Sequence, residues 1–141
     1  MRVRYLISEM WDIKDVHEIL DAIQFAIKYY DISDAKSTLT VRLMNGKHEK
    51  VEASADRIKN KRYEIRLARA QIDTTLEAVL LALFHEMTHV KQFIKDGFIN
   101  QVPYIWKNKR ASLDQDYWLS PWEMEARAME RALIAEYEKH R

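Results

Sequence analysis

The sequence predicts an α+β fold in a single domain of residues 1–141. Apolar residues recur at spacings of three and four in two long segments, 12–30 and 76–95, which is typical of amphipathic helices. Shorter segments, among them 38–44 and 62–68, alternate apolar and polar residues, which is typical of strands. The chain has only two glycines and two prolines, which argues against a linker and a second domain.

The first two elements follow from alternation and from helical periodicity. Residues 2–7 alternate, which favours a short strand. Asp12 is a favourable helix N-cap, and the apolar stripe behind it continues to about Tyr30. The sequence therefore predicts a strand followed by an amphipathic helix.

A small antiparallel sheet is predicted from the next segments. Residues 38–44 are followed by Asn45-Gly46, a dipeptide typical of a two-residue hairpin turn. Residues 47–53 are therefore expected to return as the antiparallel partner strand, and the polar residues 54–61 to form a connection. Residues 62–68 alternate again, and we expect this sheet to pack against the helices.

Sequence signals mark the starts of the last two helices. Thr74 followed by Glu77 is a capping box for the helix 76–95. Ser120-Pro121 is a favourable start for a closing helix that continues to about Lys139. The two helices are expected to pack against each other and against the sheet.

The helix 76–95 carries the pattern His-Glu-x-x-His. Residues four apart on a helix lie about 40° apart around its axis and roughly 6 Å apart along it, so His85 and His89 can reach one metal ion. Glu86 lies beside them, where its carboxylate could act on a water bound to the ion without being a ligand. This division of roles is that of zinc peptidases, and it predicts Zn²⁺ as the cofactor.

A catalytic zinc site has three protein ligands and an open position for water, so one more ligand is needed. The chain contains no cysteine, which excludes disulfides and thiolate ligands. Glu123 and Glu125, at the start of the closing helix, are the candidates, and helix geometry leaves both open. Glu123 also fits a simpler interpretation, a capping-box residue that bonds back to Ser120.

These motifs resemble the zincin metallopeptidases, and more narrowly the gluzincin-like small peptidases, in which a second helix carries Glu-x-x-Ala-Asp. The matching residues are His85-Glu86-Met87-Thr88-His89 and Glu123-Met124-Glu125-Ala126. The order of elements over residues 12–137 is similar to the minimal zincin core of the SprT-like proteins, although a third downstream histidine is not evident. The resemblance implies a zincin-like fold, zinc peptidase activity and Glu123 as the third ligand. Arg127 stands where the family usually has Asp, so the carboxylate that would orient a ligand histidine comes from elsewhere or is missing.

The predicted function is hydrolysis of peptide bonds, with a peptide or protein as the substrate. Glu86 would accept a proton from the metal-bound water and pass it to the leaving amine. Tyr104 and Tyr117 are candidate contacts to the oxyanion or the substrate. The strand 62–68 could offer an unpaired edge to an extended peptide.

An alternative function is a zincin-fold binding module, an adaptor for protein or nucleic acid in which zinc is structural. Its motivation is the long connection before Ser120, which contains aromatic residues together with Lys107, Lys109 and Arg110. A loop held in place by its aromatic residues, with a solvated basic tip, is the simpler interpretation of this segment.

Composition narrows the choice of partner and compartment. The formal net charge of +1 does not by itself call for nucleic acid or an anionic membrane. No segment approaches about 18 consecutive apolar residues, and the N-terminal residues have no long apolar region. We therefore expect a cytoplasmic protein that does not bind a membrane, with an oligomeric state that the sequence does not specify.

Overall fold

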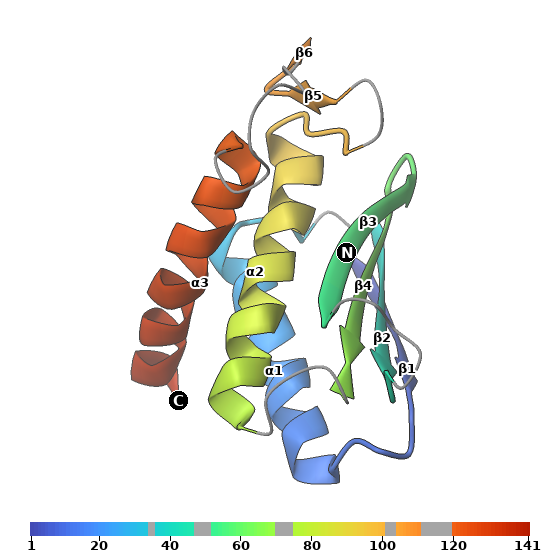
Figure 1. Cartoon of the computed structure of the whole chain (residues 1–141), viewed down its shortest axis with the longest axis vertical. Helices are drawn as coiled ribbons and strands as arrows, with labels where there is room; N and C mark the ends of the chain where they lie inside the picture. The colour runs from blue at the N-terminus through green and yellow to red at the C-terminus, as the bar shows by residue number, and fades with distance from the viewer. Residues whose placement is uncertain (34–35, 47–51, 70–74, 101–103, 111–119) are drawn as a thin grey trace.

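The computed structural model describes residues 1–33, 36–46, 52–69, 75–100, 104–110 and 120–141. Its architecture is α+β, which confirms the predicted class (Figure 1). A four-stranded sheet is covered on one face by two helices, and a third helix packs on the far side of the central helix. The elements are β1 (Arg2–Ile7), α1 (Ile13–Tyr29), β2 (Thr38–Met44), β3 (Ala53–Lys59), β4 (Arg62–Ala68), α2 (Leu76–Lys95), β5 (Ile105–Trp106), β6 (Lys109–Arg110) and α3 (Pro121–His140).

The sheet is mixed, so the predicted antiparallel sheet is wrong. Its strand order is β1-β2-β4-β3; β1, β2 and β4 are parallel, and only β3 is antiparallel to its neighbour. The predicted partner of β2, residues 47–53, lies mostly outside the described residues. No position beside β2 is left for it, because β1 occupies one edge of β2 and β4 occupies the other. Long-range strand pairing, which local patterns do not encode, decided this arrangement.

Residues 54–61, predicted as a connection, form most of β3 and the turn that follows it. The two-residue hairpin turn of this sheet is therefore Asn60-Lys61, between β3 and β4. Gly46 has a positive φ of 82° at the end of β2, and a Cβ there would lie 2.7 Å from the Cβ of Ala68. Gly46 thus permits a close backbone approach to β4 and does not turn the chain into an antiparallel partner of β2.

The helices form where the sequence places them. Asp12 caps α1 by accepting a hydrogen bond from the backbone of Lys14. The cap of α2 is Thr75, which accepts a bond from the backbone of Ala78, whereas the predicted cap Thr74 lies outside the described residues. No helix among the described residues has the length and apolar content to cross a bilayer.

The central helix α2 is buried along most of its length because it lies between the sheet and α3 (Figure 1). Phe84, at its middle, is fully buried and packs edge-on against Phe25 of α1 and Tyr137 of α3. Burial of apolar surface of this kind contributes about 25 cal/mol per Å². This packing holds α2 rigidly, and α2 carries the two histidines of the motif.

Candidate metal centre

His85, His89 and Glu123 come together between α2 and the first turn of α3. The carboxylate of Glu123 lies 3.1 Å from Nε2 of His85 and 2.9 Å from Nε2 of His89. One ligand atom from each residue lies within 4.8 Å of the other two. Ligand atoms of a tetrahedral zinc site with bonds of 2.0–2.1 Å are about 3.3 Å apart, so a small adjustment would place one ion among them. The group could therefore hold a metal ion, and nitrogen and oxygen donors suit zinc among other divalent metals.

The structure separates the two candidates for the third ligand. Glu123 is 3% exposed and bridges the two histidines. Glu125 instead accepts hydrogen bonds from Lys91 at 2.9 Å and from Gln92 at 3.0 Å. The side chain of Ser120 makes no capping hydrogen bond at the start of α3. The geometry thus favours Glu123 over Glu125 as the ligand, and the position of both Glu123 carboxylate oxygens at the histidines favours this role over that of a helix cap.

Each histidine is also held through its other ring nitrogen. Nδ1 of His85 lies 2.8 Å from a carboxylate oxygen of Glu130 on α3, and Nδ1 of His89 lies 2.7 Å from Oε1 of Gln92. Gln92 in turn donates to the backbone carbonyl of Trp122 at 2.9 Å. Partners of this kind fix the ring orientation and the tautomer, so that Nε2 of each histidine faces Glu123, where a metal ion would be held.

Sequence reasoning missed Glu130 and Gln92. Both were detectable in principle, because Glu130 lies seven residues after Glu123 and Gln92 three residues after His89, on the same helix faces. The carboxylate expected at the position of Arg127 is supplied by Glu130, one turn later on α3. The departure at Arg127 therefore does not leave His85 without an orienting carboxylate.

Replacing Glu130 by alanine should lower the affinity for zinc by about 10–100-fold, because the ring of His85 loses the group that orients it. Competition with a chromophoric chelator measures this affinity. The matched control is Glu136→Ala, which removes an exposed carboxylate from the same helix and should leave the affinity unchanged. Equal zinc affinities in the two variants would contradict the orienting role of Glu130.

The group carries protons when no metal is bound. Burial alone would lower the pKa of His85, but its hydrogen bonds to Glu123 and Glu130 outweigh this effect and raise the pKa. The pKa of His89 is also raised, because its bond to Glu123 outweighs the opposing effect of burial. A metal ion that bound here would have to displace these protons, which would make its binding dependent on pH.

Glu86 lies beside the three donors and is 7% exposed. Burial raises the pKa of its carboxyl group to about 7, against the opposing effect of the neighbouring His89 and His85. In the metal-free chain the Glu86 carboxyl group can therefore both accept and release a proton near neutral pH.

A cleft leads to this group. It has a volume of about 240 Å³ and is lined by Glu86, His89 and Glu123 together with residues 53–55 of β3 and with Tyr104, among others. The ring of Tyr104 stacks on Trp122, with centroids 5.7 Å apart, so the structure places this predicted contact at the cleft. The second predicted contact, Tyr117, lies outside the described residues.

The prediction that the strand 62–68 offers an unpaired edge to a peptide is wrong. β4 (Arg62–Ala68) lies between β2 and β3 and has no free edge. Among the described strands, β1 and β3 form the two edges of the sheet, and β3 is the edge strand that lines the cleft. Its position follows from the β3–β4 hairpin, which the sequence patterns did not indicate.

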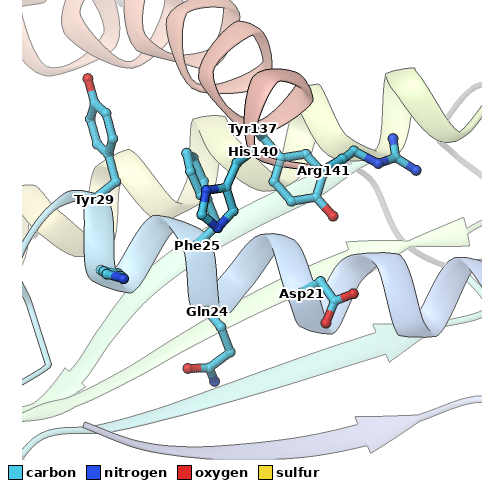
Figure 2. A pocket seen from close by; sticks show the side chains of 8 residues that line it. Asp21, Gln24, Phe25, Tyr29, Tyr137, His140 and Arg141 are labelled. Atoms are coloured by element: carbon cyan, nitrogen blue, oxygen red, sulfur yellow. The ribbon is translucent and has the colours of Figure 1, made fainter.

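A larger groove, of about 630 Å³, lies away from the metal-binding group, between α1 and the end of α3 (Figure 2). Phe25, Tyr29 and Tyr137 supply its aromatic wall, and the ring of His140 lies against Phe25 with centroids 5.5 Å apart. No set of three metal-ligating side chains lies in this groove among the described residues. The donor atoms, and not the volume, therefore identify the candidate site.

Comparison of the chain with known protein families, with curated proteins and with solved structures finds no match. A functional conclusion therefore depends on the geometry of the site.

Proposed function

We propose that the chain is a zinc-dependent metallopeptidase with a zincin-like arrangement of its site. The observation that carries the proposal is the convergence of His85, His89 and Glu123 from two helices, with a buried carboxylate beside them. A motif placed on a helix by chance would not bring a third ligand from a segment 34 residues after His89 to the same point. The cleft of about 240 Å³ gives a substrate access to the donors.

His85, His89 and Glu123 would hold the ion. A bound Zn²⁺ would lower the pKa of a coordinated water to about 7 and polarise the scissile carbonyl. The carboxylate of Glu86 accepts the proton of the attacking water and passes it to the leaving amine. Tyr104 is positioned at the cleft to contact the substrate.

The outer edge of β3, with which no described strand pairs, is the surface on which an extended peptide would lie. Its backbone groups can add main-chain hydrogen bonds to a substrate strand, which positions a peptide without reading its side chains. Ala53, Ser54 and Ala55 are small, so the edge beside the cleft leaves room for substrate side chains. We therefore expect an unfolded or extended segment as the substrate.

The test uses the full chain loaded with one equivalent of zinc and a pool of unstructured peptides. Mass spectrometry should detect new peptide termini; 1,10-phenanthroline should abolish them, and added zinc should restore them. Full zinc occupancy without any cleavage would refute the peptidase and favour the alternative, a binding module with structural zinc. In that case removal of zinc should sharply lower the stability of the chain.

A further inference from the structure

The face of the sheet turned away from the helices carries a set of arginines. They are Arg2 and Arg4 on β1, Arg42 on β2, and Arg62 and Arg66 on β4, and we call them the arginine face. The strand register places them in adjacent rows, because Arg2 and Arg62 are both aligned with Thr38, and Arg42 is aligned with Arg66. No described helix covers this side of the sheet (Figure 1). All five arginines are exposed to solvent.

The positive charge of this face is only partly neutralised. Glu64, which is 6% exposed, forms ion pairs with both Arg42 and Arg66. The strand register places one other carboxylate, Asp56 of β3, opposite Glu64. No carboxylate among the described residues lies within ion-pair distance of the three remaining guanidinium groups, those of Arg2, Arg4 and Arg62. Five arginines therefore face these two carboxylates, although the net charge of the whole chain is only +1.

The arginine face surrounds a depression of about 340 Å³. Arg2, Arg4, Arg42 and Arg62 line it, together with the hydroxyl-bearing Thr38 and Thr40. Guanidinium groups bind phosphate oxygens through two parallel hydrogen bonds, and threonine hydroxyls are common donors to phosphate. The depression thus has the donors that a phosphate-bearing ligand needs.

We propose that the arginine face binds nucleic acid through its phosphate backbone. Arg2 and Arg4 are two residues apart on one strand, a separation of about 6.6 Å, and Arg62 lies two strands away, about 10 Å across the sheet. A single phosphate cannot contact groups spread over this area, whereas a chain of phosphates can. The charge complementarity therefore fits a polymeric anion.

Recognition at this face is independent of base sequence. Tyr63 is the aromatic residue that lines the depression, and its ring stacks on Phe93 of α2, with centroids 6.0 Å apart, on the helix side of the sheet. The described residues of this face therefore provide no aromatic platform on which bases could stack. We expect single-stranded and double-stranded nucleic acid to bind with affinities that depend on salt and not on sequence. The arginine face and α2, which carries the two histidines, lie on opposite sides of the sheet. This inference therefore does not depend on the proposed peptidase activity.

The experiment measures fluorescence anisotropy of labelled single-stranded and double-stranded oligonucleotides with the full chain, from 50 to 200 mM salt. The test variant combines Arg2→Gln, Arg4→Gln and Arg62→Gln, which break no ion pair among the described residues. It should lower the affinity at least tenfold at 50 mM salt and reduce the slope of log K against log salt by about three. Circular dichroism and thermal unfolding establish that the variant is folded.

The matched control combines Lys14→Gln, Arg131→Gln and Lys139→Gln, which remove the same charge from exposed positions on α1 and α3. It should change the affinity less than twofold. Equal losses in the two triple variants, or no binding of either oligonucleotide by the unmodified chain at 50 mM salt, would overturn the proposal. Poly-glutamate that binds as tightly as an oligonucleotide of equal charge would also overturn it and would assign the face to an acidic protein partner.

Discussion

The Glu86→Gln variant should retain zinc and lose peptide hydrolysis. Glu86 lies in the cleft beside the donors but is not one of the three side chains that could hold the ion, so its replacement leaves the ligand set intact. Glutamine has nearly the same shape but cannot accept a proton from the attacking water. General acid–base groups contribute about 10²–10⁴-fold to a rate, so we expect kcat to fall within this range.

Two measurements made together test this role. Peptide cleavage gives kcat, and elemental analysis of the same sample gives zinc per chain. The matched control is Glu77→Gln, an exposed carboxylate in the first turn of the same helix, which should change neither quantity. Undiminished hydrolysis by the Glu86→Gln protein would exclude Glu86 as the general base.

The Glu123→Gln variant should bind zinc more than 100-fold less tightly than the unmodified chain. This loss should exceed that caused by removing the orienting carboxylate of Glu130, because Glu123 contributes a donor atom and a negative charge directly to the ion. The buried carboxylate of Glu123 faces both histidines, and no other acidic side chain belongs to the donor group among the described residues.

Glu125→Gln is the matched comparison, two residues away on the same helix. It removes the acceptor of Lys91 and Gln92 but no donor of the metal-binding group, so zinc affinity should fall less than tenfold. Titration against a chromophoric chelator gives both constants. A larger loss in Glu125→Gln than in Glu123→Gln would reverse the assignment of the third ligand.

The helical part of the fold and two of the three donors were predictable because their signals are local. The three long helices start and end within one or two residues of the predicted positions. The spacing of His85 and His89 alone places their rings on one side of α2. The strands β1, β2 and β4 were also predicted with correct bounds, since each alternates in the sequence.

Strand pairing was not predictable in the same way. Asn45-Gly46 favoured a local hairpin, but two parallel partners from distant parts of the sequence occupy both edges of β2. The cost of closing the intervening loops is compensated by contacts that no short window of sequence contains. Because of this pairing, the edge strand beside the cleft is β3, whereas the sequence patterns had predicted β4.

The amino-acid sequence by itself determined the α+β class, the helices and the pair of histidines that face one point, because hydrophobic periodicity and spacing along one helix are properties of neighbouring residues. Only the tertiary structure decided that Glu123 and not Glu125 faces that point, that Glu130 and Gln92 hold the rings, and that five arginines gather on one face of the sheet. These choices depend on how α3 crosses α2 and on which strands are neighbours. Packing between distant segments sets both, and a one-turn shift of α3 would exchange the side chains that reach the histidines.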